Sequence, residues 1–282
     1  MKLLRFGPKW AEKPGLLDAE GRVRDLSGVI DDVAGAALSP AGLARLAAVD
    51  PAELPLAPAD ARLGACVGSV GKFVAIGLNY SEHAAEAGMA IPKEPVVFMK
   101  ATSCLSGPND DVVTPRGSTK LDWEVELGVV IGTEARYVTK EEALDFVAGY
   151  CVVNDVSERA FQSERGGTWD KGKGCDTFGP IGPWLVTRDE IPDPQALRLW
   201  LSVDGVTRQD GTTATMIFSV AELVSYVSQF MSLQPGDVIT TGTPAGVGLG
   251  HKPEPIFLKV GQVMRLGVEG LGEQTQRVGP AV

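Results

Sequence analysis

The segment at residues 121–131 constrains the fold of this chain more than any other, because acidic and apolar residues alternate along it. Apolar residues occupy every odd position, and Asp122, Glu124 and Glu126 lie at even positions. Successive side chains of a strand point to opposite faces, so a strand here would carry three carboxylates on one face. A solvated polar face would explain this pattern. A bound cation would explain it as well, because acids are depleted in strands and like charges about 7 Å apart repel each other.

A further acid interrupts the apolar run at residues 149–156. Asp155 follows residues that are apolar enough to form a buried strand. A buried carboxylate needs a partner. One candidate is the start of the next helix, which Asp155 or Asn154 would cap. The other is a hard divalent ion shared with Glu124 and Glu126, for which an all-oxygen ligand set indicates Mg²⁺ or Mn²⁺, with Ca²⁺ as a further candidate.

The composition is that of an ordinary globular protein and excludes several functions. The chain has 282 residues, of which 44% are hydrophobic and 22% charged, which fits one large domain or two unequal ones. Its 26 Lys and Arg against 36 Asp and Glu give a net charge of −10, so nucleic acids and anionic membranes are poor partners. We find no signal peptide and no membrane-spanning segment, and therefore expect a cytoplasmic protein.

The histidines and cysteines narrow the choice of metal. With only two histidines, a metal centre built mainly on imidazole is excluded. The four cysteines lie far apart without a C-x-x-C spacing, which argues against a zinc or redox site. We expect all four to be small buried hydrophobes, namely Cys66, Cys104, Cys151 and Cys175.

Three prolines mark the one domain boundary that the sequence suggests. Pro51, Pro55 and Pro58 lie among alanines and acids, which predicts an extended linker over residues 47–62. We expect a small N-terminal α+β domain over residues 1–68 and a catalytic domain over residues 69–282. Strands dominate the second part, so a β-rich α+β fold is favoured over a doubly wound sheet. Strands are expected at 2–6, within 15–25, and at 72–77, 96–100, 111–114, 121–132, 148–155, 182–187, 197–203, 238–241 and 262–268, and helices at 39–48, 80–87, 140–146, 158–165 and 219–231.

Two further segments carry candidate catalytic side chains. His83 and Glu86 are three residues apart and share a helical face, which suits a general base held by a carboxylate, or else a plain surface pair. Residues 166–174 fit G-x-x-x-x-G-K, but Gly174 replaces the Ser or Thr of a P-loop and no strand precedes the run. Lys173 is then either a solvated loop lysine or an ammonium suited to an anionic substrate or a developing enolate.

The glycine-rich turn at residues 241–248 follows a strand. It leads to no helix, so a dinucleotide site is not indicated. Such a turn is either a plain tight loop or a set of backbone N–H groups that, with the Thr243 hydroxyl, contacts a carboxylate.

Five motifs in order along the chain resemble the fumarylacetoacetate hydrolase family, from about residue 70 onward. The resemblance implies a mixed β-roll or β-sandwich catalytic domain, a homodimer, and a divalent ion held by Glu124, Glu126 and Asp155. The motifs are Gly77-Leu-Asn-Tyr-x-x-His, Asp122-Trp-Glu-x-Glu-Leu, Asn154-Asp155, Lys173-Gly-x-Asp-Thr-Phe-Gly-Pro and Thr241-Gly-Thr-Pro-x-Gly-Val-Gly.

The resemblance also implies roles for single residues. His83 and Glu86 match a lid dyad that activates water in the hydrolytic members, and Lys173 matches a catalytic, anion-contacting position. The implied substrate-binding residues are Tyr80, Arg159, Gln162, Lys173 and Thr243. The whole chain is similar to a bacterial subgroup with two names, ureidoglycolate lyase and 2,4-diketo-3-deoxy-sugar-acid (L-fuconate or L-rhamnonate) hydrolase, which disagree about the chemistry.

The chemistry that such a metal site would support favours the second name, the hydrolase. A 2,4-dioxo acid chelates a metal through its carboxylate and 2-oxo oxygen, which leaves the 4-carbonyl open to water deprotonated by His83. We therefore predict hydrolysis of an acylpyruvate, of the 2,4-diketo-3-deoxy sugar acid type, to pyruvate and a small acid. The alternatives are ureidoglycolate lysis, decarboxylation or isomerisation of a 2-oxo acid, and a non-enzymatic module with a structural Ca²⁺.

Overall fold

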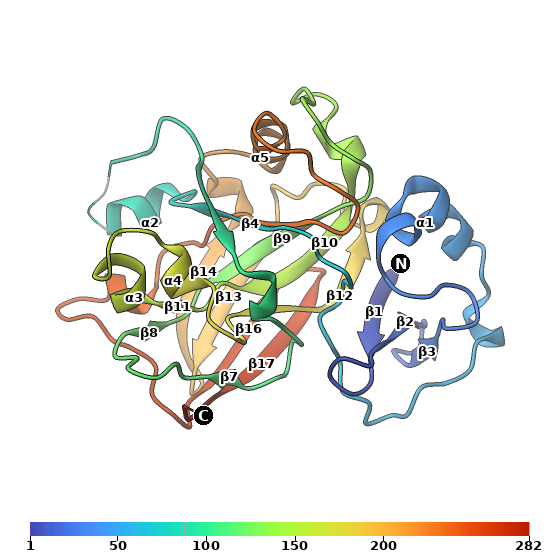
Figure 1. The fold of residues 1–282 in the computed structure, drawn as a ribbon, viewed down its shortest axis with the longest axis horizontal. Coiled ribbons are helices and arrows are strands. Elements are labelled where there is room, and N and C mark those ends of the chain that lie inside the picture. Colours follow the sequence, from blue (N-terminus) through green and yellow to red (C-terminus); the bar gives the residue numbers. More distant parts are fainter. Residues whose placement is uncertain (87, 89, 282) are drawn as a thin grey trace.

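One long mixed sheet forms the centre of the computed structural model, which describes all residues except 87, 89 and 282 (Figure 1). Its two central strands, β9 and β10, are buried along their whole length, as their mostly apolar sequences favour. The strand order is β3 (Val23–Asp25), β2 (Lys13–Leu17), β1 (Lys2–Phe6), β12 (Gly179–Thr187), β10 (Val147–Asn154), β9 (Val125–Ile131), β15 (Val238–Thr240), β4 (Phe73–Gly77) and β5 (Val96–Lys100), with β6 (Leu105–Ser106) paired to β12.

A second sheet packs against the first, because β9 and β10 contact its strands β13, β16 and β17. Its order is β14 (Val206–Thr212), β13 (Arg198–Val203), β16 (Val263–Val268), β17 (Gly272–Gly279) and β7 (Val112–Val113), and a separate pair joins β11 (Ser157–Glu158) to β8 (Leu121–Asp122). The core therefore lies between the two sheets, and the β-rich α+β fold predicted from the sequence is confirmed.

Short helices cover the ends of the sheets. In Figure 1, α5 lies at the top and α2, α3 and α4 lie at the left. The α-helices are α1 (Pro40–Ala47), α2 (Ser81–Glu86), α3 (Arg159–Ser163), α4 (Asp170–Lys173) and α5 (Val220–Ser228). The 3₁₀ helices are η1 (Gly35–Leu38), η2 (Pro51–Glu53), η3 (Thr102–Cys104), η4 (Ala143–Phe146), η5 (Arg188–Glu190), η6 (Thr213–Thr215) and η7 (Gly248–Gly250).

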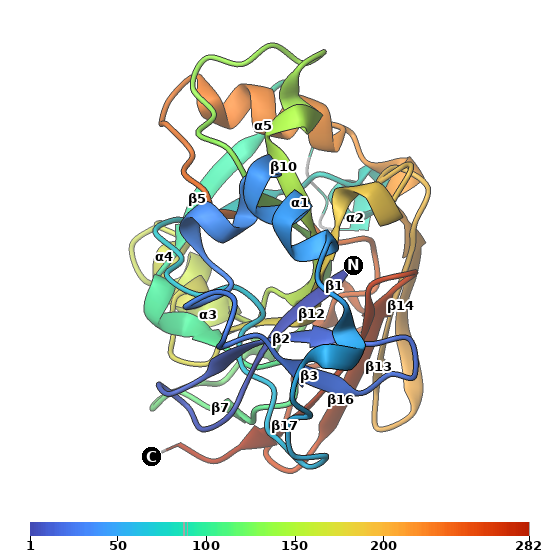
Figure 2. The same cartoon turned by 90° about the vertical axis from the view of Figure 1, so that its right-hand side faces the viewer.

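The first strands of the chain belong to the central sheet. β1 pairs with β12, so the N-terminal residues, at the right of Figure 1 and in front in Figure 2, extend the same sheet that contains β9 and β10. The division at residue 68 stays a prediction about domains. None of the helices among the described residues is long and apolar enough to cross a membrane.

Several local expectations were wrong. The helix expected at residues 140–146 is only the 3₁₀ turn η4, and Cys175 is half-buried rather than buried. The strand expected at 121–132 is divided into β8 and β9, and both of its faces are buried, so the solvated polar face does not exist. The strand β17 was missed because its sequence is polar, yet the amides of Gln274 and Gln276 point inward and donate to backbone carbonyls.

Candidate metal centre and active site

Three carboxylates meet where β9 begins and β10 ends. Glu124 directly precedes β9, Glu126 lies within it, and Asp155 directly follows β10. The antiparallel register pairs Glu126 with Val153, and the Asp155 N–H donates to the Glu124 carbonyl at 2.9 Å. One oxygen of each carboxylate lies within 4.8 Å of the others, and all three residues are at most 4% exposed. The alternation along β9 and the pairing with β10 thus build one acidic cluster.

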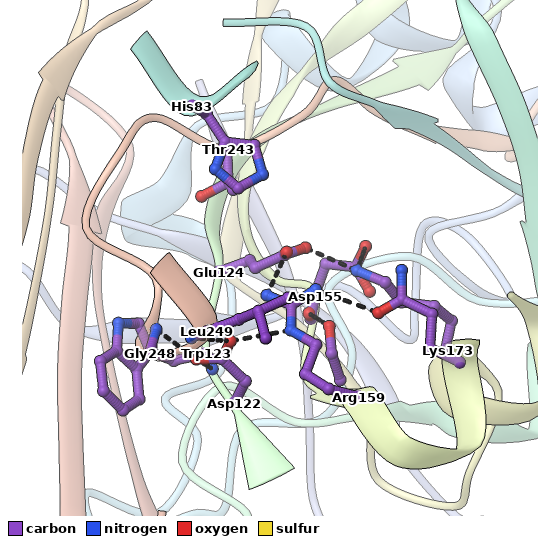
Figure 3. A network of polar contacts seen from close by, with 12 residues as sticks. His83, Asp122, Trp123, Glu124, Asp155, Arg159, Lys173, Thr243, Gly248 and Leu249 are labelled. Carbon is purple, nitrogen blue, oxygen red and sulfur yellow. Dashed lines mark hydrogen bonds and ion pairs between the residues drawn. The ribbon is translucent and has the colours of Figure 1, made fainter. Parts of the chain in front are cut away.

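Buried cations from three other elements pair with this cluster (Figure 3). The Lys173 ammonium, on α4, lies 2.6 Å from Glu124 Oε2 and 2.8 Å from Asp155 Oδ2. The Arg159 guanidinium, on α3, donates to Glu124 Oε1 at 2.7 Å, and Lys100, at the end of β5, lies 2.5 Å from Asp155 Oδ1. Charges are buried at a tolerable cost only when they are paired in this way.

These contacts decide between the sequence alternatives for Asp155 and Lys173. Asp155 does not cap a helix, because its carboxylate binds two ammonium groups, and the Glu158 side chain caps α3 instead. Lys173 is 2% exposed, so it is not a solvated loop lysine.

The pKa values of the two glutamates move in opposite directions. Burial alone would raise the pKa of Glu124, but the charges of Lys173 and Arg159 outweigh it and hold that pKa well below its usual range. Burial raises the pKa of Glu126 well above its ordinary value, and the negative charges of Asp155 and Glu124 raise it further. A cation beside Glu126 would favour its ionised form against both burial and the negative charges of Asp155 and Glu124. Together with the all-oxygen donor set, this fits a hard divalent ion.

Lys100 was missed as a site residue by the sequence analysis. It is 1% exposed, and besides Asp155 its ammonium binds the backbone carbonyl of Lys173. The available sequence signal is a lysine that ends an apolar strand, Val-Val-Phe-Met-Lys. That signal does not reveal the partner, which lies 55 positions further along the chain.

Asp122, on the same polar face as Glu124, acts as a connector. Its carboxylate accepts from Arg159 Nε at 2.8 Å and from the backbone N–H groups of Gly248 at 2.7 Å and Leu249 at 3.0 Å. It thereby fixes the glycine-rich loop relative to the guanidinium that holds Glu124.

The glycine-rich loop offers its N–H groups to carboxylates, as one sequence alternative proposed, but these belong to the protein itself. Gly242 N–H donates to Glu126 at 2.8 Å, and Gly246 N–H donates to Glu86 at 3.1 Å. The Thr243 hydroxyl donates to the Val125 carbonyl at 2.8 Å and accepts from Gln209. Thr243 lines the cavity, with its hydroxyl already bound on both sides.

His83 and Glu86 form a pair on α2, with 3.3 Å between His83 Nδ1 and Glu86 Oε2. His83 is 8% exposed and lines the same cavity as the acidic cluster, so the pair is not a plain surface contact. Figure 3 shows the imidazole on the opposite side of Glu124 from Asp122. The Gly246 N–H also holds the Glu86 carboxylate in place. Because Glu86 lies at Nδ1, the second imidazole nitrogen, Nε2, is the one left for other partners.

The acidic cluster and His83 line one cavity, which has about 600 Å³ of space, its open mouth included. The three carboxylates, together with Arg159, Gln162 and Lys173, form what we call its charged floor. Tyr80 does not line this cavity. It is 1% exposed, and its hydroxyl has no hydrogen-bond partner among the described residues, so the substrate contact expected of Tyr80 has no support in its placement.

A β-rich fold around a buried, oxygen-only acidic cluster defines a candidate divalent-metal enzyme. The chain belongs to the fumarylacetoacetate hydrolase family, because the family model "Fumarylacetoacetate (FAA) hydrolase C-terminal" matches residues 72–279. Members of the family are enzymes that use a metal ion.

Individual relatives agree with this assignment. A Burkholderia cenocepacia protein provisionally named a hydrolase is 69% identical over 98% of both chains. The fumarylacetoacetate hydrolase of Exiguobacterium antarcticum is 35% identical over 99% of both chains, with a TM-score of 0.86. A maleylpyruvate hydrolase from a Sphingobium species, solved with manganese(II) and pyruvate, is 29% identical over the full length of both chains, with a TM-score of 0.81.

Proposed function

We propose that this protein hydrolyses the C–C bond between C3 and C4 of a 2,4-dioxo acid, releasing pyruvate and a carboxylic acid. The observation that carries the proposal is the His83–Glu86 pair, whose buried imidazole lines the same cavity as the cluster of Glu124, Glu126 and Asp155. A base facing a chelating site is what attack of water on a metal-bound dioxo acid requires.

The charged floor would hold the pyruvate end of the substrate. A divalent ion, Mg²⁺ or Mn²⁺, would be held by Glu124, Glu126 and Asp155 and would supply Lewis-acid stabilisation of negative charge on the 2-oxo oxygen. The Lys173 ammonium has three N–H donors, and two of them serve Glu124 and Asp155, which leaves a third for the developing enolate.

Gln162 would orient the substrate carboxylate. Its side-chain oxygen accepts from Arg159 at 3.1 Å, so its amide nitrogen is the part that remains for a ligand. Arg159 is bound to Asp122 and Glu124, and its hydrogen bond to the Gln162 oxygen holds the Gln162 amide in place.

His83 would act on water at the other end of the substrate. Glu86 at Nδ1 selects the tautomer in which Nε2 is the basic nitrogen. Water loses a proton to Nε2 and its oxygen bonds to C4. The C3–C4 bond then breaks, its electron pair forms the C2–C3 enolate, and the proton held on Nε2 is returned to C3, which completes pyruvate.

The test is hydrolysis of an acylpyruvate by Mn²⁺-loaded protein in ¹⁸O-water, followed by mass spectrometry of both products. We expect one ¹⁸O atom in the released carboxylic acid, and loss of turnover in His83→Ala with Mn²⁺ binding retained. Turnover that survives in His83→Ala would assign the water to another base.

Product analysis with the substrate of each alternative reaction separates these alternatives on this site. A decarboxylase would release CO₂ and pyruvate from oxaloacetate, and an isomerase would change the ultraviolet spectrum of its 2-oxo acid without releasing pyruvate. Ureidoglycolate lysis would give glyoxylate. Any of these products in place of labelled acid would replace the hydrolase proposal.

A further inference from the structure

Beyond its charged floor, the cavity has a second surface that nothing in the proposed mechanism uses. We infer that this surface selects a substrate whose acyl group beyond C4 is apolar, such as a short alkyl or a phenyl group, over one that ends in a second carboxylate or in hydroxyl groups. This inference rests on the proposed function, since it names the substrate class of the same site.

The surface, which we call the apolar wall, is assembled from four parts of the chain. Phe98 on β5 and Trp169 before α4 meet edge to face, with ring centroids 5.2 Å apart at 66°. Trp169 lies so close to β4 that a Cβ on Gly77 would stand 2.5 Å from its ring. The wall consists of Ile76, Leu78, Phe98, Trp169, Val247 and Leu249.

The wall begins directly beside the charged floor. The Lys173 ammonium, which binds Glu124 and Asp155, lies 5.4 Å from the centroid of the Phe98 ring. A substrate whose 2-oxo end is at Lys173 would therefore place its next carbons against Phe98. The neighbouring ring, Trp169, extends this aromatic surface beyond Phe98.

The backbone at Leu78, a residue of the apolar wall, has an unfavourable conformation. Leu78 has a φ of +54°, a left-handed conformation that costs a non-glycine residue free energy and tends to persist at functional sites. The next residue, Asn79, is fully buried and binds Phe218 and Thr241 through its amide. These bonds fix the strained turn and with it the Leu78 side chain in the wall.

The positive charges on the cavity lining, as the described residues form it, are already paired with protein acids. Arg159 is neutralised by Asp122 and Glu124, and Lys173 by Glu124 and Asp155. His83, the remaining basic side chain, binds Glu86. A second carboxylate at the wall would therefore be desolvated without a counter-charge, which is costly.

Hydroxyl groups at the wall would fare little better. The Thr243 hydroxyl already donates to Val125 and accepts from Gln209, and the six side chains of the wall offer one N–H, on Trp169. Each methylene that leaves water for this wall instead gains roughly fourfold in affinity, the equivalent of about 0.8 kcal/mol.

Three six-carbon 2-oxo acids that differ only in their tails test the inference. They are 2-oxohexanoate with a methyl end, 2-oxoadipate with a carboxylate end, and 4-hydroxy-2-oxohexanoate with a hydroxyl group on its tail. Calorimetric titration into the Mn²⁺-loaded full-length protein should give a dissociation constant at least about tenfold lower for 2-oxohexanoate than for the other two. Equal or tighter binding of either polar acid overturns the inference.

Matched aromatic variants assign the preference to the wall. Phe98→Ala should bring the three dissociation constants together, by weakening 2-oxohexanoate alone. Phe230→Ala is the control, because Phe230 forms a similar edge-to-face pair with Tyr226, centroids 4.9 Å apart, on the exposed surface. If Phe98→Ala weakens all three acids equally, the ring only supports Lys173 and the inference is wrong.

Turnover separates this inference from the proposed function. Pyruvate released from 2,4-dioxooctanoate tests the hydrolase reaction, whereas the binding series does not depend on cleavage. Preference for 2-oxohexanoate without pyruvate release would keep the apolar wall and refute the hydrolase. Pyruvate release together with tighter binding of a polar acid would do the reverse.

Discussion

Ion pairs occur both at the charged floor of the cavity, where Lys100 binds Asp155 from outside the lining, and on the outer surface of α5, but their surroundings differ completely. Lys100 and Asp155 are at most 1% exposed in their side chains, whereas Lys140 and Glu222 are 53% and 37% exposed. Exposed pairs contribute little to stability, and buried pairs barely repay their desolvation. The buried charges are therefore explained by chemistry, because replacing them with apolar residues would serve the fold at least as well.

The largest expected effect follows from removing one carboxylate charge from the floor. Asp155→Asn keeps the size of the side chain but leaves Lys100 and Lys173 without the charge of their shared partner and removes a carboxylate oxygen from the proposed metal site. We expect kcat/KM to fall at least about 100-fold, since even residues that only support a metal ligand cost 10–100-fold. Mn²⁺ should no longer raise the melting temperature. Asp145→Asn at an exposed pair is the control, and an active Asp155→Asn protein would refute the metal centre.

Lys100→Met comes next and sharpens the contrast on stability. Breaking a buried pair from one side costs about 3–5 kcal/mol, and we expect the lower end because Asp155 keeps Lys173. Lys140→Met, at the exposed pair, should cost less than about 1 kcal/mol. Urea unfolding measures both variants. If Lys100→Met and Lys140→Met lower the free energy of unfolding equally, burial does not distinguish the two ion pairs.

The smallest effect concerns Glu222, which completes the capping box of α5 with Ser219. Hydrogen bonds from Lys140 and the Ser219 backbone lower its pKa from 4.5 to about 2. Because the pKa of Glu222 is lower in the folded protein than in the unfolded chain, the ionised carboxylate stabilises the fold at a pH above the unfolded pKa. This stabilisation is lost as the pH falls through the folded pKa. Glu222→Gln keeps the cap, so it should cost less than about 1 kcal/mol at pH 7. The difference should vanish between pH 4.5 and 2, and a constant difference would contradict the assignment.

The two central strands were predictable because most residues of β9 and β10 are apolar. Strand β17 was not predictable, since Gln274 and Gln276 are buried by hydrogen bonds to carbonyls that only the fold brings near. Local periodicity finds residues that are buried because they are apolar. It cannot find polar residues whose partners lie far along the chain.

The same limit divides the site. Glu124, Glu126 and Asp155 were predicted as metal ligands from the strand alternation and the order of the motifs, and the structure brings them together as one acidic cluster. Lys100 and the apolar wall were not found, because their neighbours come from distant strands and loops. The metal roles, the homodimer and the cytoplasmic location stay predictions.

By pairing with β12, the strand β1 covers an edge of the sheet that could otherwise pair with strands of other molecules. A shortened protein that kept only the matched residues 72–279 would expose the row of N–H and C=O groups on β12 that β1 now occupies. Such open edges recruit strands from other molecules. The N-terminal segment thus protects, at a distance, the neighbouring strands whose ends carry the acids.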